Sequence, residues 1–292
     1  MKKDKIFEGV CTALVTPFKD NCIDYETMGK LIERQINAGV NALVVCGTTC
    51  ENATLSDGEH KRLIRFTVET VSGRVPVIAG TGSNDTRHAC EMSRYAADVG
   101  ADALLTVTPY YNKANEDGLY HSFRTIAETV SLPIILYNVP TRTCVDLSPG
   151  VCSRLSEIHN IVALKEASPS LEKAIYTRHL CKDGLTLYSG NDDLTLPMLS
   201  IGAKGVISVL SNLMPKEMCA LYRAWERNER DKAEELQIEL CPIMRAMFCD
   251  VNPIPLKYAM SRLGLCSETV RLPLFTLSEE KKKIIDNLIP NA

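Results

Sequence analysis

Short apolar runs recur along the chain, and the spans between them are each long enough for one helix. The spans carry apolar residues at helical spacing, as in Tyr25–Ala38, where Met28, Leu31 and Ile32 share one face. Strands that are apolar on both faces and alternate with helices are typical of a parallel sheet covered by helices. The eight runs that predict strands are residues 10–15, 42–46, 75–79, 103–107, 134–137, 161–164, 185–188 and 206–209.

Eight strand–helix units without a Pro/Gly/Ser linker predict one closed (β/α)8 TIM barrel over residues 1–214, which carries the active site. From Pro215 onward only helical spacing remains, so we expect residues 215–292 to form a helical C-terminal extension packed on the barrel. An open Rossmann sheet is the alternative. It requires G-x-G-x-x-G after its first strand, and the nearest match, residues 80–84, follows the third run and lacks the last glycine.

The composition is that of an ordinary globular protein. The 292 residues include 33 Lys and Arg against 36 Asp and Glu, so the formal net charge is −3. This balance argues against nucleic acid or an anionic membrane as the main partner. No apolar run approaches the roughly 20 residues that a membrane helix needs. The first residues lack the long apolar segment of an export signal, so we expect a cytoplasmic protein.

The 12 cysteines and five histidines are spread along the chain. No C-x-x-C pair occurs, and the histidines lack the spacing of metal ligands, so neither a disulfide framework nor a metal site is predicted. Several cysteines lie within apolar runs, where cysteine acts as a small apolar side chain. We expect them to be reduced thiols with structural roles.

In a (β/α)8 barrel the chemistry is carried by residues at the carboxyl ends of the strands. Lys165 follows the apolar run at residues 161–164, so its side chain is expected to begin inside the barrel. Burial lowers the pKa of a lysine and frees its amine as a nucleophile toward carbonyls. A structural ion pair with Glu166 is the alternative, but neighbours on a strand point to opposite faces.

Other polar residues follow neighbouring runs. Tyr137 ends the run before Lys165 and could transfer protons, although a rim tyrosine bound to the backbone is the alternative. Thr48, Thr49 and Tyr111 add hydroxyls at the same edge. The guanidinium of Arg142 suits a carboxylate, unless it forms a surface salt bridge. The residues alone predict a cofactor-free class I aldolase or lyase that acts on a keto acid.

Motifs at these strand ends resemble the 4-hydroxy-tetrahydrodipicolinate synthase family of pyruvate-dependent class I aldolases. The likeness extends from about Gly9 to the C-terminus. It implies a lyase of lysine and diaminopimelate biosynthesis that condenses pyruvate with L-aspartate 4-semialdehyde, without a cofactor, as a homotetramer built from two dimers. The matching motifs are Gly47-Thr48-Thr49-x-Glu51, Val107-Thr108-Pro109-Tyr110-Tyr111-Asn112, Tyr137-Asn138-Val139-Pro140-Thr141-Arg142-Thr143, Leu164-Lys165-Glu166, Asn252-Pro253-Ile254-Pro255-Leu256-Lys257 and Arg271-Leu272-Pro273-Leu274.

The resemblance also implies roles for individual residues. Lys165 would form the Schiff base with pyruvate, and Tyr137 would relay protons together with Thr49. Tyr111 would complete the relay of a neighbouring subunit. Arg142 would bind the carboxylate of the semialdehyde. The remaining substrate-binding positions are Thr48 and Thr49 at the pyruvate carboxylate, with Gly190 and Ile207 lining the substrate mostly through backbone groups.

Two cysteines stand where the family usually has glycine. Cys50 lies in the G-T-T-G-E motif, and Cys144 follows Thr143. If either position requires a positive φ, a cysteine strains the loop, and otherwise the replacement is neutral.

A further set of residues matches the family's feedback site for lysine at the dimer interface. Asp57 and His88 stand where lysine-sensitive members often carry His and Glu. The missing Glu removes a carboxylate partner for the ligand's ammonium groups, so the sequence leaves lysine inhibition open. The residues at or near matching positions are Asn52, Ala53, His60, Asn84, His88 and Tyr110.

Two alternatives accompany this interpretation. N-acetylneuraminate lyase and related pyruvate aldolases share the barrel, the tyrosine and the lysine, but they usually lack an arginine at the position of Arg142. A non-catalytic barrel that binds pyruvate belongs to a different class. The intact set of Lys165, Tyr137, Thr49 and Tyr111 argues against it.

Overall fold

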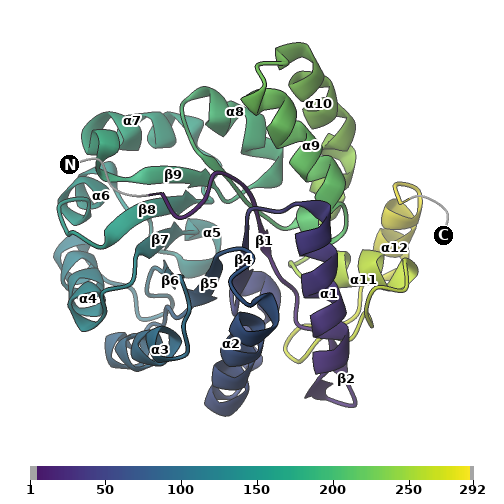
Figure 1. Ribbon diagram of the computed structural model, residues 1–292, viewed down its shortest axis with the longest axis horizontal. Coiled ribbons are helices and arrows are strands. Elements are labelled where there is room, and N and C mark those ends of the chain that lie inside the picture. Colours follow the sequence, from purple (N-terminus) through teal and green to yellow (C-terminus); the bar gives the residue numbers. More distant parts are fainter. Residues whose placement is uncertain (1–4, 290–292) are drawn as a thin grey trace.

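A closed barrel of eight parallel strands forms the centre of the protein (Figure 1). This computed structural model describes residues 5–289. The strands are hydrogen-bonded in the order β1-β10-β9-β8-β7-β6-β5-β4, and β4 pairs with β1 to close the barrel. Each predicted apolar run contributes one strand, so the (β/α)8 prediction is confirmed. The strands are β1 (Gly9–Ala13), β4 (Ala42–Val45), β5 (Val77–Gly80), β6 (Ala103–Val107), β7 (Ile134–Asn138), β8 (Ile161–Glu166), β9 (Thr186–Ser189) and β10 (Gly205–Ser208).

Helices cover the outside of the strands (Figure 1). Their ends follow local capping rules: Ser56 and Glu59 form a capping box at the start of α2, and α1 ends at Gly39 with φ 86°. The helices up to the last strand are α1 (Tyr25–Ala38), α2 (Asp57–Val71), α3 (Thr86–Asp98), α4 (Glu116–Thr129), α5 (Pro140–Thr143), α6 (Pro149–Leu155), α7 (Leu171–Cys181) and α8 (Thr195–Ser200). The 3-10 turns are η1 (Thr48–Cys50), η2 (Asn52–Thr54), η3 (Lys182–Gly184), η4 (Asp192–Leu194) and η5 (Leu210–Asn212).

Two apolar clusters hold these layers together. One fills the barrel interior and includes Val44, Ile78, Ile135 and Ile207. The other lies between the strands and the surrounding helices. The strands are apolar on both faces because each face is buried in one of these clusters.

Between residues 215 and 289 the regular elements are helices, as predicted, and a non-helical segment separates the last two. They are α9 (Pro215–Glu226), α10 (Arg230–Ala246), α11 (Ile254–Arg262) and α12 (Glu279–Asp286). Helix α9 contacts β1 and α1 and so takes a place in the ring around the barrel. Helix α11 contacts η5 and α12, and both C-terminal helices lie on the side of the barrel that carries α1 (Figure 1). The division of the chain into two domains at residue 215 stays a prediction.

A short hairpin of β2 (Phe18–Lys19) and β3 (Cys22–Ile23) follows β1. No pattern in the sequence predicts it, because strands of two residues are too short for a recognisable alternation. Its buried Phe18 packs against the side chains of Lys257 and Arg271. Lys257 Nζ and Arg271 Cζ each lie 4.4 Å from the centroid of the Phe18 ring. Among the described residues, no helix is both long and apolar enough to cross a membrane.

Candidate active site

Lys165 and Tyr137 lie next to each other at the carboxyl ends of β8 and β7. They are paired across the two strands, and paired residues of a sheet point to the same face. Both side chains are buried, and Lys165 Nζ lies 4.1 Å from the centroid of the Tyr137 ring. The register of two strands therefore brings an amine and a phenol together.

Glu166 points away from Lys165, as the alternation along a strand predicts. Its carboxylate accepts hydrogen bonds from Asn138 Nδ2 at 2.9 Å and from the backbone N–H of Ser168 at 2.7 Å, and it lies 3.6 Å from Lys173 Nζ. Over residues 5–289, no ion pair joins Lys165 to an acidic side chain. Its amine is thus buried without a carboxylate partner among the described residues.

A cavity of about 1050 Å³ opens beside Lys165. The strand ends supply one part of its wall, and α10 with the segment that follows it supplies another. The structure therefore brings most of the predicted catalytic and substrate-binding residues to one place. Those that line the cavity are Thr48, Thr49, Tyr137, Arg142, Lys165 and Gly190.

Asn252 connects two polar side chains of this cavity, a role that no sequence pattern predicts. Its side-chain Nδ2 donates a hydrogen bond to Thr49 Oγ1 at 3.0 Å, and its backbone carbonyl oxygen accepts one from Arg142 Nη2 at 3.1 Å. These partners lie 203 and 110 residues away in sequence, so no local pattern reveals the contact. The only sequence signal was that Asn252 begins one of the family motifs.

Gly190 lies where the cavity wall leaves no room for a side chain. A Cβ at this position would approach Ala167 Cβ to 2.6 Å, and the Gly190 N–H donates to the carbonyl oxygen of Glu166 at 2.7 Å. Ile207 is fully buried inside the barrel. It is not among the described residues that line the cavity.

Tyr111 lies outside the cavity of its own chain. Its side chain is 91% exposed, in the segment between β6 and α4, where its φ is 67°. A phenol this exposed to solvent does not contact Lys165 of the same chain. The expectation that Tyr111 shares the site therefore depends on a second copy of the protein.

Sequence and structure comparisons point to one family. Residues 6–292 match the sequence model of the Dihydrodipicolinate synthetase family. The chain belongs to this family. It is 46% identical over 280 residues to the 4-hydroxy-tetrahydrodipicolinate synthase of Acetivibrio thermocellus, an alignment that covers 96% of this chain and 95% of the relative. The resemblance seen in the sequence motifs is thereby confirmed.

Solved structures of the family have the same fold. The dihydrodipicolinate synthase of Aquifex aeolicus is 43% identical with a TM-score of 0.95, over 97% of both chains. The chloride-inhibited enzyme of Acinetobacter baumannii, solved in complex with pyruvate, is 40% identical with a TM-score of 0.94. That alignment covers 97% of this chain and 98% of the other.

The two cysteines that stand where the family usually has glycine differ in backbone conformation. Cys144 is exposed and has a φ of 54°, in the left-handed region, where a side chain is strained. Cys50 is buried and is not among the described residues with positive φ, so cysteine does not strain the backbone there. Its Sγ lies 2.8 Å from Thr16 Oγ1.

The residues predicted from the family's lysine-binding feedback site divide into two groups. Asn52, Ala53 and Tyr110 line a second cavity of about 220 Å³, which also contacts Tyr137 and Arg142. A ligand in this cavity would therefore lie against the walls of the candidate active site.

The other three residues of the predicted lysine-binding site are not among the described residues that line this second cavity. His60 is buried, its Nε2 lies 2.8 Å from the carbonyl oxygen of Gly80, and burial lowers its pKa. His88 Nε2 lies 3.7 Å from an Asp57 oxygen. The backbone carbonyl oxygen of Asn84 accepts a hydrogen bond from Asn112 Nδ2.

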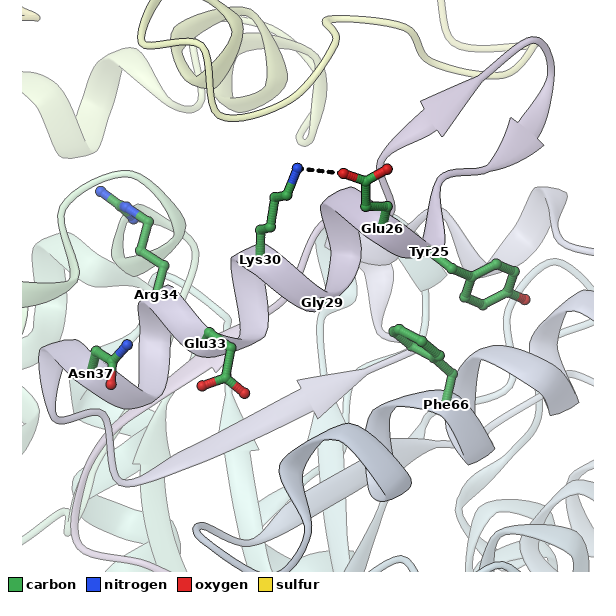
Figure 2. Close-up of a pocket in the computed structure, with 8 residues that line it drawn as sticks. All are labelled: Tyr25, Glu26, Gly29, Lys30, Glu33, Arg34, Asn37 and Phe66. Atoms are coloured by element: carbon green, nitrogen blue, oxygen red, sulfur yellow. Dashed lines mark hydrogen bonds and ion pairs between the residues drawn. The ribbon is translucent and has the colours of Figure 1, made fainter.

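An open groove of about 780 Å³ lies elsewhere, along the outer face of α1 (Figure 2). It contains none of the predicted site residues. Its charged side chains already have partners, since Lys30 binds Glu26 at 2.6 Å, Glu33 binds Arg74, and Arg34 donates to the backbone carbonyl oxygens of Asn212 and Leu213. At its other end Tyr25 packs edge-on against Phe66, with 4.9 Å between ring centroids. The groove resembles a solvated helix surface rather than a reaction site.

Proposed function

We propose that the protein condenses pyruvate with L-aspartate 4-semialdehyde to form 4-hydroxy-tetrahydrodipicolinate, through a Schiff base at Lys165. The observation that carries this proposal is the buried amine of Lys165, unpaired with any acid of the described chain and 4.1 Å from the ring centroid of Tyr137. Family membership and the name of the Acetivibrio relative support the reaction, which makes the protein a lyase of lysine and diaminopimelate biosynthesis.

The chemistry follows from an amine and a phenol in one cavity. Lys165 Nζ attacks the ketone carbon of pyruvate, and the carbinolamine loses water to leave the imine. The imine nitrogen then withdraws electrons, so a proton leaves the methyl group and an enamine forms without any cofactor. Tyr137 transfers these protons, and the hydroxyl of Thr49 passes them on.

The enamine attacks the aldehyde carbon of the second substrate and forms the new carbon–carbon bond. The amino group of the adduct then attacks the imine carbon, closes the ring and displaces Lys165 as the free amine. The guanidinium of Arg142 has five N–H donors and gives one to Asn252, so the rest can bind the carboxylate of the semialdehyde. Thr48 and Thr49 form the turn that receives the carboxylate of pyruvate.

Tyr111 acts in the site of a neighbouring copy, in a homotetramer built from two dimers. Its 91% exposure supports this proposal, because a relay tyrosine must be covered when it works. Mixing Lys165→Ala chains with Tyr111→Phe chains tests it. Hybrid dimers join an intact lysine to an intact tyrosine, so the mixture should exceed the activity of either variant alone. A mixture no more active than its components would place Tyr111 outside the relay.

The reaction is tested by following L-aspartate 4-semialdehyde with and without pyruvate, coupled to a reductase that oxidises NADPH on the cyclic product. We expect the loss to depend on pyruvate, and Lys165→Ala to reduce kcat/KM by about 10⁴-fold or more. Borohydride with pyruvate should leave an adduct on Lys165, detected by mass spectrometry. An adduct without turnover would point to another aldol acceptor, as in N-acetylneuraminate lyase. The absence of an adduct would overturn the proposal.

A further inference from the structure

A fully buried ion pair joins the residue that follows the Thr48–Cys50 turn to the C-terminal helix α11. Lys257 Nζ donates to Glu51 Oε1 at 2.8 Å, and the two side chains are 0% and 1% exposed. Lys257 Nζ also donates to the carbonyl oxygen of Thr16 at 2.8 Å. The second carboxylate oxygen of Glu51 accepts from the backbone N–H of Arg271 at 3.0 Å. Both charges are therefore held by several partners from separate parts of the chain.

A buried ion pair contributes little net stability to the contact between two elements. The desolvation of both charges commonly costs more free energy than their attraction contributes. Apolar residues of the same size often stabilise a fold equally well. Burial lowers the pKa of Lys257, and the Glu51 carboxylate opposes that shift. Glu51 also carries a φ of 56°, a strained conformation for a residue other than glycine. Costs of this kind are expected where geometry matters more than stability.

The geometry at stake is that of Thr49. Glu51 lies two residues after Thr49, and its backbone N–H closes the turn on the carbonyl oxygen of Thr48 at 3.0 Å. Asn252, which binds the Thr49 hydroxyl, lies five residues before Lys257, at the start of α11. Two contacts therefore join this region to α11: Asn252, just before the helix, binds Thr49 of the turn, and Lys257, within the helix, binds Glu51 directly after the turn.

We propose that the Glu51–Lys257 ion pair positions the Thr49 hydroxyl for the reaction by fixing the Thr48–Cys50 turn against α11. Neither residue is among the described residues that line the two cavities at the site, so both act through Thr49 rather than on the substrate. This inference rests on the proposed function, in which Thr49 relays protons. It makes the C-terminal segment a part of the catalytic apparatus.

The double variant E51Q/K257M tests the proposal, because it removes both charges and leaves neither one buried alone. The glutamine oxygen can still accept the Arg271 N–H. We expect a melting temperature near that of the wild type. We expect kcat to fall by about 100-fold, because a displacement of ~1 Å costs a reacting group on that order. Wild-type kcat in a folded double variant would overturn the proposal.

A mutant cycle with T49V separates positioning from general loosening of the fold. If the pair acts through the Thr49 hydroxyl, E51Q/K257M should cost little further kcat once that hydroxyl is gone. Additive losses would overturn the proposal. The KM for pyruvate should change much less than kcat, since the missing group acts in proton transfer rather than in binding.

Two further variants keep the test informative. E51D retains both charges but shortens the acid by one methylene, so kcat should fall even if the double variant does not fold; unchanged kcat would count against the proposal. D286N is the matched control, since it weakens the contact of α11 with α12 through Tyr258, the residue after Lys257, and leaves both partners of the Glu51–Lys257 ion pair in place. It should lower the melting temperature and leave kcat unchanged; a fall in kcat like that of E51D would attribute the effect to loosening of α11.

Failure of this inference and failure of the proposed function give different results. If wild-type protein forms no borohydride-trapped pyruvate adduct at Lys165, the proposed function itself is wrong. If the adduct forms and the mutant cycle is additive, only the positioning role of Glu51 and Lys257 is wrong.

Discussion

The candidate site has two halves that are held in different ways. In the strand half, Lys165 and Tyr137 are placed by the register of β8 against β7, a ladder of backbone hydrogen bonds. In the loop half, Thr49 and Arg142 lie on turns beyond the strands and both contact Asn252. Changes in the strand half should therefore remove a chemical group and leave its surroundings intact. Changes in the loop half should also shift neighbouring groups.

The strand half should show the largest kinetic effect. Tyr137→Phe removes only the hydroxyl, so we expect kcat to fall by about 10²- to 10⁴-fold while the fold and the binding of pyruvate persist. Steady-state kinetics and the melting temperature measure the two effects. A variant with wild-type kcat would remove Tyr137 from the relay.

Tyr188→Phe is the matched control for Tyr137. Tyr188 is paired with Lys165 on its other side, from β9, but its hydroxyl donates to the carbonyl oxygen of Phe7 at 2.8 Å. We expect a loss of about 1 kcal/mol of unfolding free energy and little change in kcat. A large loss of kcat would mean that any change beside Lys165 disturbs the site.

Arg142 in the loop half should affect mainly the binding of the second substrate, with a smaller effect on Thr49 through Asn252. Arg142→Ala removes charge-assisted hydrogen bonds, so the KM for L-aspartate 4-semialdehyde should rise by about 10- to 100-fold. The rate of pyruvate adduct formation should change much less than this KM, because Arg142 reaches Thr49 only through Asn252. Arg245→Ala is the comparison, because Arg245 lines the same cavity from α10. If Arg245→Ala raises this KM and Arg142→Ala does not, the carboxylate binds at the other arginine.

The segment after α11 should show a dependence on pH. Hydrogen bonds from Arg271 lower the pKa of Glu59 to about 2, so the pair stabilises the folded state above the pKa of the unfolded acid. Glu59→Gln should cost about 1–2 kcal/mol of unfolding free energy at pH 7. The difference from the wild type should shrink as the pH falls from about 4 toward 2, where Glu59 takes up a proton. An equal difference at pH 7 and pH 3 would contradict this origin.

The two cysteines at family glycine positions should respond in opposite directions. Cys144→Gly relieves a left-handed residue and should stabilise the protein by about 1 kcal/mol. Cys50→Gly removes a buried side chain from a backbone that does not need glycine, and should destabilise it by about 1 kcal/mol. Denaturant unfolding of both variants measures the difference. The same sign for both would mean that φ does not decide the effect.

The barrel and the strand half of the site could be predicted from the sequence because both follow local patterns. Each apolar run marks a strand through its own composition, and the order of the parallel strands follows from the repeated strand–helix unit. Lys165 and Tyr137 could be proposed as site residues because Lys165 stands directly after such a run and Tyr137 ends one. The β2–β3 hairpin escaped prediction because its strands have only two residues each.

The amino-acid sequence by itself determined which residue types stand at the strand ends, and with them the amine and the phenol. Only the tertiary structure decided that Asn252 connects Thr49 to Arg142, that Lys257 pairs with Glu51, and that Tyr111 is left in solvent. The physical reason is range. Periodicity reports how a residue relates to neighbours a few positions away, whereas a contact such as that of Lys257 with Glu51, 206 residues apart, exists only after the chain has closed its barrel and docked its last helices.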